Sequence, residues 1–184
     1  MQDSELIENI LNGKTQYFEV LIDKYQPAVF LTAIGFVHVK EDAEDIVQEV
    51  FVKVYQSLAG FKGDASFSTW LYRITVNVSL NHLNRNKFRL LIGFTDNLLH
   101  HENRYSEDLN PADEIIGNEN ARIIRKAIDS LPDKQRTAFV LSKYEDMPQK
   151  QIAEILQVTE GAVEQLLQRA KQSLQKKLKH LVGK

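Results

Sequence analysis

The stretch from residue 148 to residue 178, PQKQIAEILQVTEGAVEQLLQRAKQSLQKKL, decides the expected fold of the C-terminal part of this chain. A short helix is predicted from Pro148 to Leu156, a tight turn over residues 157–159, and a long helix from Glu160 onward. Apolar residues recur along the long helix at three- and four-residue spacing: Val163, Leu167, Ala170, Leu174, Leu178 and Leu181. A short helix, a turn of three or four residues and a longer helix make the helix-turn-helix pattern.

The residues before this stretch continue the helical pattern. One apolar face stops at Leu131-Pro132 and comprises Ile115, Ile116, Ile123, Ile124, Ala127 and Ile128. Pro132 suits the first turn of the next helix, which we expect to end near Tyr144. Residues 119–184 are therefore predicted to form one small helical unit.

Residues 1–95 also have a helical pattern, because their apolar residues recur at three and four positions rather than at two. A first stripe over residues 6–11 closes at Gly13, and a second covers residues 17–25. Pro27 then precedes a third short segment over residues 29–36, so we expect the helix to be interrupted there.

A longer helix is predicted from Glu41 to about Leu58. Its β-branched run over residues 50–54 favours a strand by propensity, but a 3.6-residue period over four turns outweighs that weak preference. The loop FKGDASFS, residues 61–68, separates it from the next helix, for which Ser66 and Ser68 are both candidate N-caps. The core-facing residues of that next helix are Leu71, Ile74, Val78 and Leu83.

Charge is distributed unevenly along the 184 residues, although 23 Lys and Arg against 25 Asp and Glu leave a net charge of only -2. Residues 1–95 carry 9 basic and 11 acidic groups, residues 96–118 carry 1 and 6, and residues 119–184 carry 13 and 8. The middle segment contains Pro111 and Gly117 and has no sustained apolar period. We therefore predict an all-α protein of two small helical domains, joined by a flexible acidic linker.

Composition excludes several classes of protein. The absence of cysteine rules out disulfides and thiolate metal sites, and a 43% hydrophobic fraction with 26% charged residues is typical of a folded chain. No apolar run approaches the roughly 20 residues of a membrane span, and the start MQDSELIENI has no basic region followed by an apolar one. A cytoplasmic protein without membrane insertion is expected.

Enzyme motifs are missing as well. The five histidines are dispersed, and no HExxH, GxSxG, P-loop or GxGxxG spacing occurs. His100-His101 could bind a metal ion, and the acidic cluster over residues 41–49 could bind a cation, but solvated surface is the commoner role of both patterns. We predict a protein without catalytic activity, metal or cofactor.

The helix that begins near Phe67 has a polar stripe of more specific character. Arg73, Asn77, Asn81 and Arg85 follow one another at four-residue spacing, and amides and cations of this kind contact base edges and phosphates. The aromatic residues nearby are Phe61, Phe67, Trp70 and Tyr72. They either stack on unpaired bases or belong to the core beneath a solvated face, and the pattern alone leaves both readings open.

Two segments resemble a known family. Residues 41–85, EDAEDIVQEVFVKVYQSLAGFKGDASFSTWLYRITVNVSLNHLNR, are similar to region 2 of the extracytoplasmic-function (ECF) subgroup of bacterial sigma-70 factors. Residues 127–178, AIDSLPDKQRTAFVLSKYEDMPQKQIAEILQVTEGAVEQLLQRAKQSLQKKL, resemble region 4 of the same subgroup. The order and the short linker also match. The resemblance implies a sigma factor that directs promoter-specific transcription initiation, with region 2 in residues 1–95 and region 4 in residues 119–184.

The resemblance also implies roles for individual residues. Those expected to contact the beta-prime clamp of core RNA polymerase are Asp45, Gln48 and Glu49. Those expected to read and melt the -10 promoter element are Phe61, Lys62, Ser66, Phe67, Trp70, Arg73, Asn77, Asn81, Arg85 and Lys87. Those expected to bind the -35 element are Thr159, Glu160, Glu164, Gln165, Gln168, Arg169 and Lys171.

The recognition helix departs from the common pattern of the family, which has Val-Lys-Ser-Arg-Leu where this chain has residues 163–167, VEQLL. The two cations of the family pattern are absent here, and one position carries an acid, Glu164. Glu164 either accepts a hydrogen bond from the cytosine amino group or lies off the DNA. Leu166 is a doubtful DNA contact. The basic tail residues Lys176, Lys177 and Lys179 either follow the DNA backbone or only solubilise the helix.

Further partners follow from the resemblance: the beta flap of the polymerase and, as is usual in this subgroup, an anti-sigma factor. The unbound protein is expected to be a monomer, and the acidic linker either enters a positive channel of the polymerase or is an inert spacer. The alternative hypothesis is a stand-alone helix-turn-helix transcription regulator, which would bind duplex promoter DNA tightly without polymerase.

Overall fold

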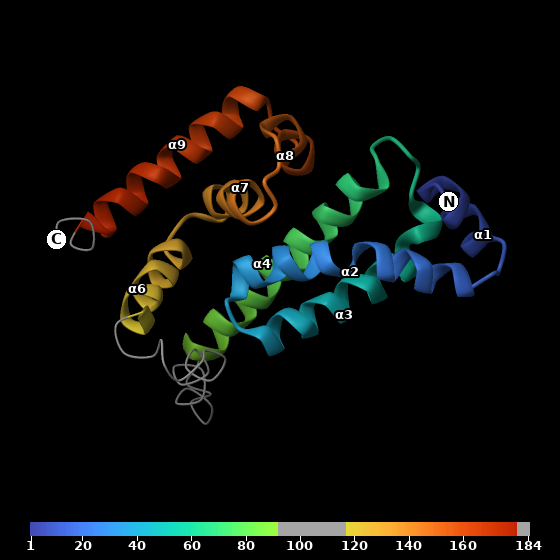
Figure 1. Ribbon diagram of the computed structural model, residues 1–184, viewed down its shortest axis with the longest axis horizontal. Coiled ribbons are helices and arrows are strands. Elements are labelled where there is room, and N and C mark those ends of the chain that lie inside the picture. Colours follow the sequence, from blue (N-terminus) through green and yellow to red (C-terminus); the bar gives the residue numbers. More distant parts are fainter. Residues whose placement is uncertain (92–116, 180–184) are drawn as a thin grey trace. The chain divides into compact units, whose positions relative to one another are not determined.

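A computed structural model of the chain describes residues 1–91 and 117–179, with side chains for residues 1–88 and 119–179. Every regular element in these ranges is a helix (Figure 1). The prediction of an all-α fold with two helical domains is confirmed. The chain divides into two compact units, Met1–Leu80 and Asn81–Lys184, with the division inside a long helix.

The first unit contains four α-helices and one short 3₁₀ turn. They are α1 (Asp3–Leu11), α2 (Gln16–Val37), α3 (Lys40–Ser57), η1 (Leu58–Gly60) and α4 (Phe67–Leu91), which continues past the division at Leu80. Helix α2 packs against both α1 and α3, and α2 and α3 run side by side in Figure 1. The 3₁₀ turn packs against α1 and α3, which brings the loop before α4 close to the start of the chain.

Burial follows the predicted apolar periods. The largest fully buried side chains of the first unit are Leu6, Leu21, Val29, Phe36, Ile46, Val50, Val54, Leu58, Leu71 and Val78. The β-branched run of residues 50–54 is helical, as expected from its period, because Val50 and Val54 both face the core. Removing such apolar area from water is the main source of stability for small helices of this kind.

The expected interruption at Pro27 is wrong. Helix α2 continues through Pro27 from Gln16 to Val37. A proline inside a helix removes one backbone hydrogen bond and costs about 3 kcal/mol in an exposed helix. Here Leu21 before it and Val29 after it are both fully buried, so packing on either side of Pro27 outweighs the local cost.

The same helix corrects a second expectation. Among the described residues, α2 is long and apolar enough to cross a membrane by length and composition alone, although the sequence had suggested no such run. In the structure α2 packs against α1 and α3, and the core helix of a soluble protein passes the same test. We therefore treat α2 as a core helix.

The second unit contains α6 (Gly117–Asp129), α7 (Asp133–Tyr144), α8 (Gln149–Leu156) and α9 (Glu160–Lys177). Helix α6 begins at Gly117, so this residue belongs to a helix and not to the predicted linker. The remainder of that linker, residues 96–116, lies outside the described residues. Helix α9 packs against the other three helices.

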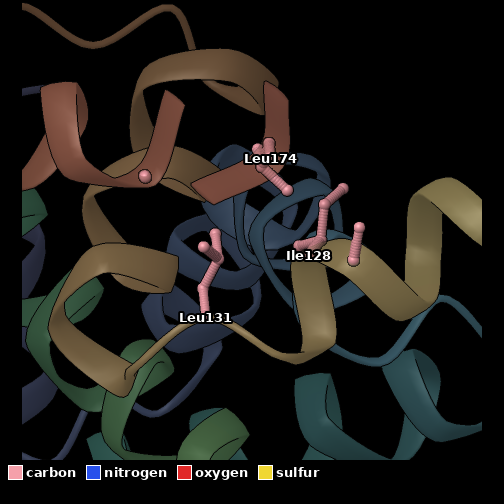
Figure 2. Packing of buried hydrophobic residues seen from close by; sticks show 5 residues of the cluster. Ile128, Leu131 and Leu174 are labelled. Atoms are coloured by element: carbon pink, nitrogen blue, oxygen red, sulfur yellow. The ribbon is translucent and has the colours of Figure 1, made fainter. Parts of the chain in front are cut away.

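A small apolar cluster joins α6 to α9 (Figure 2). Its buried members are Ala127, Ile128, Leu131, Ala170 and Leu174. Figure 2 shows Ile128 and Leu174 close together, with Leu131 at the end of the loop that leads into α7. The Lys177 ammonium donates a hydrogen bond to the Ser130 hydroxyl, so the C-terminal turn of α9 is also fixed by a polar contact.

Candidate nucleic-acid interface

The helix-turn-helix is formed by α8, a turn over residues 157–159 and α9. Gln157 ends α8 in the left-handed conformation, with φ of 55°. Thr159 begins α9: its Oγ1 accepts a hydrogen bond from the backbone N–H of Ala162 at 3.2 Å. This cap satisfies one of the N–H groups that every helix leaves unpaired in its first turn. Helix α8 begins one residue later than predicted, with Pro148 as its N-cap, and it ends at Leu156 as predicted. Helix α9 begins at Glu160, as predicted.

The outer side of α9 is polar and exposed. The residues predicted to bind the -35 element all lie on the surface: Thr159, Glu160, Glu164, Gln165, Gln168, Arg169 and Lys171. Their opposite side is the buried stripe that contains Val163, Ala170 and Leu174. Leu166 is half-buried, which fits packing better than a DNA contact. The helix therefore presents amides and cations outward, as a recognition helix requires.

Three aromatic rings gather where the loop of residues 61–66 enters α4. The ring centroids of Phe61 and Trp70 are 5.2 Å apart, those of Phe67 and Trp70 are 5.7 Å apart, and those of Phe61 and Phe67 are 5.8 Å apart. We call Phe61, Phe67 and Trp70 the aromatic cluster. Such distances are typical of favourable tilted or edge contacts between rings.

Burial separates the roles of the three rings. Phe67 is only 3% exposed, so the expectation that its own ring contacts DNA does not fit its position. Its side chain is a core residue on which Phe61 and Trp70, both partly exposed, are packed. The cluster therefore combines both readings left open by the sequence. The Phe67 ring belongs to the core, and the Phe61 and Trp70 rings reach the surface.

The start of α4 is fixed by a network of hydroxyl groups. Ser66 is the N-cap, because its Oγ accepts from the backbone N–H of Thr69 at 3.1 Å. The same oxygen is 2.9 Å from the hydroxyls of Ser68 and Thr69. Gly63 adopts a φ of +76° in the preceding loop, a conformation that side chains with a Cβ rarely adopt. Lys62 and Ser66 are both exposed in this fixed loop.

Along α4 the predicted polar stripe faces outward. Asn77, Asn81, Arg85 and Lys87 are exposed, whereas Arg73 is half-buried. Two exposed residues on the same side were missed at first: Asn84, and Phe88 at 62% exposed. Their positions, three and seven residues after Asn81, would have identified both as neighbours on the helix surface.

The residues predicted to contact polymerase lie on the exposed side of α3. Asp45 and Gln48 are exposed, and Glu49 is half-buried with its carboxylate 3.6 Å from the Lys53 ammonium. An ion pair at this spacing on a helix surface contributes only a few tenths of a kcal/mol. This pair therefore adds little to the stability of α3.

The exposed side of α3 continues with apolar side chains that the sequence reasoning missed. Val52 is 53% exposed and Tyr55 is 50% exposed, although an edge of the Tyr55 ring contacts Phe18. Their positions, four and seven residues after Gln48, place them on the same side as Asp45 and Gln48. The surface is therefore acidic at one end and apolar at the other.

In residues 1–91 and 117–179 no group of three or more His, Asp or Glu side chains is placed to hold a metal ion. The histidine pair at residues 100 and 101 lies outside the described residues.

Comparison with known families identifies both units. The family model "Sigma-70 region 2" matches residues 21–89, and the model "Sigma-70, region 4" matches residues 121–174. The first match includes the α3 surface, the aromatic cluster and the α4 stripe, and the second includes the helix-turn-helix.

Relatives match over nearly the whole chain. The RNA polymerase sigma-H factor of Pseudomonas aeruginosa is 31% identical over 98% of this chain and 96% of its own length. The ECF RNA polymerase sigma-E factor of Escherichia coli strain K12 is 32% identical over 99% of this chain and 97% of its own length. The corresponding factor of Haemophilus influenzae is 31% identical over 99% and 98%.

Solved structures have the same fold. CnrH in complex with the cytosolic domain of CnrY matches with a TM-score of 0.66 and 23% identity, covering 97% of both chains. The sigma factor RpoE in complex with the anti-sigma factor NepR from Bartonella quintana matches with a TM-score of 0.61 and 22% identity, covering 88% of this chain and 96% of that one.

These matches confirm the predictions of a sigma factor and of a non-enzymatic protein, and they exclude the stand-alone regulator. The chain belongs to the ECF subgroup of the sigma-70 family of RNA polymerase sigma factors and acts in transcription initiation.

Proposed function

We propose that this sigma factor opens the -10 element by capturing an unpaired base at the aromatic cluster and holding the neighbouring strand along α4. The observation that carries the proposal is the arrangement at the start of α4. Two partly exposed rings, Phe61 and Trp70, rest on the buried Phe67 and are followed by the exposed amides of Asn77 and Asn81. Stacking on aromatic rings stabilises an unpaired base by about 1–3 kcal/mol.

The energetics suit melting without nucleotide hydrolysis. Taking one base out of the duplex costs a few kcal/mol, which stacking and hydrogen bonds to the base can offset. A rigid acceptor lowers the cost further, because little side-chain freedom is lost on binding. The capped start of α4 and the buried Phe67 supply that rigidity. The cations Lys62, Arg73, Arg85 and Lys87 would hold the strand by its phosphates.

The -35 element is assigned to the exposed side of α9. Gln165 and Gln168 are suited to base edges, and Arg169 and Lys171 to phosphates. Glu164 is exposed on the same helix, where it either accepts from a cytosine amino group or disfavours close approach of a phosphate.

Core polymerase is assigned to the α3 surface. Asp45, Gln48 and Glu49 supply polar contacts to the beta-prime clamp, and Val52 and Tyr55 extend the contact with apolar area. Interfaces of this kind depend mainly on a few partly apolar anchors, while charges at the edge steer association. The helix-turn-helix unit is the proposed partner of the beta flap.

An anti-sigma factor is a further proposed partner, because RpoE has been solved with the anti-sigma factor NepR and CnrH with the cytosolic domain of CnrY. We place the protein in the cytoplasm, where polymerase and promoter DNA are, as a monomer when unbound. For the acidic linker, both predicted roles stay open: it enters a positive channel of the polymerase or is an inert spacer.

The decisive experiment is in vitro transcription with core polymerase on genomic promoters, combined with permanganate reactivity of thymines in the -10 element. The wild-type holoenzyme should start transcripts and make thymines reactive. Trp70→Ala and Asn81→Ala should reduce that reactivity while -35 binding is maintained. Asn120→Ala, an exposed amide on α6, is the matched control. Equal loss of -10 opening and -35 binding would contradict the assignment of α4.

A further inference from the structure

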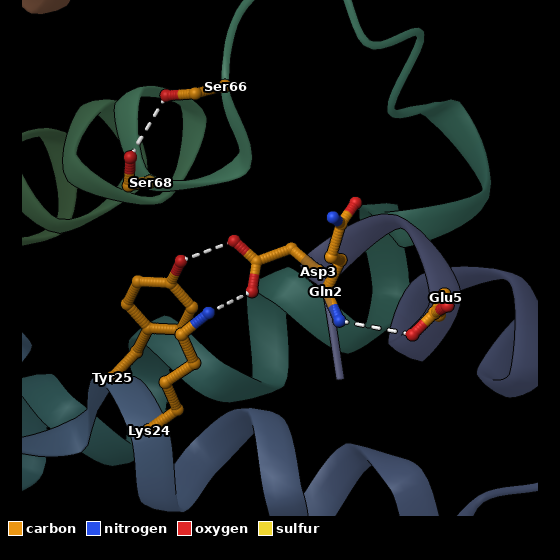
Figure 3. A network of polar contacts seen from close by, with 7 residues as sticks. All are labelled: Gln2, Asp3, Glu5, Lys24, Tyr25, Ser66 and Ser68. Carbon is orange, nitrogen blue, oxygen red and sulfur yellow. Dashed lines mark hydrogen bonds and ion pairs between the residues drawn. The ribbon is translucent and has the colours of Figure 1, made fainter.

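The first turn of α1 is linked by hydrogen bonds to the helix that supports the aromatic cluster (Figure 3). The two carboxylate oxygens of Asp3 have different partners on α2: Oδ2 accepts from the Tyr25 hydroxyl at 2.6 Å, and Oδ1 pairs with the Lys24 ammonium at 2.5 Å. Figure 3 shows both side chains of α2 pointing to this one carboxylate, with Ser66 and Ser68 of the α4 start drawn nearby.

The Tyr25 ring continues the contact to α4. Its centroid is 5.3 Å from that of Phe67, with the ring planes inclined by 59°. Phe67 in turn contacts Phe61 and Trp70. An unbroken series of contacts therefore leads from Asp3 through Tyr25 and Phe67 to the two rings that reach the surface.

The hydrogen bond from the Tyr25 hydroxyl to the Asp3 carboxylate is charge-assisted and therefore strong. A hydroxyl that donates to a carboxylate makes a shorter and stronger hydrogen bond than two neutral groups do. Burial raises the pKa of the Tyr25 phenol well above its ordinary value of 10, and the hydrogen bond and charge of Asp3 raise it further. The phenol is therefore protonated, and a donor, at every physiological pH.

Helix α1 is also held by apolar packing. Leu6, Ile7 and Ile10 are buried and hold the helix by apolar contacts. The Asp3 carboxylate adds a polar contact to that packing: it accepts from the hydroxyl of Tyr25, whose ring contacts Phe67. Well-packed interiors pass on small displacements, because they contain little empty space.

We infer that Asp3 and Tyr25 are positioning residues for base capture at the -10 element: α1 holds the Tyr25 ring against Phe67, and Phe67 holds Phe61 and Trp70 in the geometry that accepts the base. This inference rests on the proposed function of the aromatic cluster. Functional sites lose efficiency when their groups shift by about 1 Å, so the residues that support them affect function without contacting the ligand.

The test uses holoenzyme assembled from core polymerase and the full-length chain, with fork promoter fragments whose -10 strand is already single. Affinity is measured for fragments that carry either the preferred base or a different base at the captured position. The variants are Asp3→Ala, Tyr25→Phe, their combination, and Asp3→Glu as the conservative replacement. Trp70→Ala is the reference for the pocket itself. Asn9→Ala is the matched control, since Asn9 lies on α1 like Asp3, donates to the Glu5 backbone carbonyl and accepts from the Lys14 ammonium.

Asp3→Ala and Tyr25→Phe should each reduce the preference for the correct base by about fivefold, the factor that corresponds to one lost hydrogen bond. The combined variant should be no worse than either single one, because both remove the same link. Asp3→Glu should restore most of the preference, and Asn9→Ala should leave it unchanged. Affinity for core polymerase should be the same for all of these proteins.

Two results would overturn these ideas separately. If Trp70→Ala leaves the base preference unchanged, the proposed function of the aromatic cluster is wrong. If Trp70→Ala removes the preference while Asp3→Ala and Tyr25→Phe do not, or if Asn9→Ala reduces it equally, the positioning role is wrong. Melting temperatures of all variants, measured alongside, separate loss of the folded domain from loss of base preference.

Discussion

At the scale of single residues, the Tyr25 phenol has a consequence for stability at high pH. Its pKa is raised in the folded chain by burial and by Asp3, whereas in the unfolded chain it lies near 10. The stability that this shift contributes is fully present below pH 10, and it decreases as the pH rises above 10, because the unfolded phenol ionises first.

Tyr25→Phe should therefore lower the free energy of unfolding by about 1 kcal/mol at pH 7, and the difference from wild type should shrink above pH 10. Urea denaturation followed by fluorescence of Trp70, the only tryptophan in the chain, measures both values. Tyr55→Phe, at a half-exposed ring, is the control. A difference from wild type that is constant up to pH 11 would refute this account.

A second residue-scale prediction concerns the ion pair between α6 and α7. The Arg136 side chain is almost fully buried, and its Nη2 donates to Asp129 Oδ1 at 2.5 Å. Removing one partner of a buried pair leaves an uncompensated charge. Because Asp129 is about one-third exposed, we expect Asp129→Ala to cost roughly 2–3 kcal/mol, less than a fully buried pair would.

Replacing both partners should be milder. Asp129→Ala combined with Arg136→Met removes the buried charge and keeps much of the packing volume. Hydrogen exchange of the α7 amides measures local stability in the intact chain. We expect faster exchange in Asp129→Ala than in the double variant. Faster exchange in the double variant would contradict the explanation that the unpaired Arg136 charge destabilises the single variant.

At the scale of elements, the α3 surface leads to a prediction for polymerase binding. Val52→Glu introduces a charge on the apolar end of that surface without touching the core. We expect at least a tenfold loss of affinity for core polymerase, equal to about 1.4 kcal/mol. Leu11→Glu on α1 makes the same change at a residue of nearly equal exposure, 52% against 53%, and should have no effect. Similar losses for both variants would mean that exposed apolar area in general, and not α3, determines binding.

The start of α9 allows its helix-capping and DNA-binding roles to be separated. Thr159→Ala removes the cap and should cost about 1 kcal/mol of stability along with -35 affinity. Thr159→Ser should preserve both. Thr159→Asp should restore the cap but still weaken DNA binding, because it adds a negative charge near the phosphates. Thermal melts and binding of holoenzyme to -35 DNA distinguish the three variants. Full DNA affinity in Thr159→Asp would place Thr159 away from the phosphates.

The elements also show what the sequence could and could not predict. Apolar spacing predicted the burial of Val50, Val54 and Val163, because it depends on neighbours in sequence. Capping chemistry narrowed the N-cap of α4 to Ser66 or Ser68, and the structure selects Ser66. The continuity of α2 through Pro27 was not predictable, since it depends on packing on both sides of the proline. The burial of Phe67 and its contact with Tyr25 likewise depend on helices that are distant in sequence.

At the scale of the whole molecule, the net charge of -2 is the sum of -2 over residues 1–95, -5 over residues 96–118 and +5 over residues 119–184. Affinity for duplex DNA depends strongly on how many phosphates are neutralised. Among the residues proposed to bind the -35 element, the cations are Arg169 and Lys171, and the acidic residues are Glu160 and Glu164, all of them exposed. We therefore expect the unbound chain to bind DNA weakly, and most of the promoter affinity to come from assembly with polymerase.

This reasoning predicts that the unbound chain binds a promoter duplex no more tightly than about 10⁻⁴–10⁻⁶ M at physiological salt, the range of non-specific binding, whereas the holoenzyme binds far more tightly. In the holoenzyme, Arg169→Gln with Lys171→Gln should reduce the slope of log affinity against log salt by about 0.9 for each cation that contacts a phosphate. Lys126→Gln with Lys143→Gln, exposed cations on α6 and α7, is the charge-matched control and should leave the slope unchanged. Equal changes for both pairs would show that net charge alone acts, because a direct contact depends on position whereas a general attraction depends only on total charge.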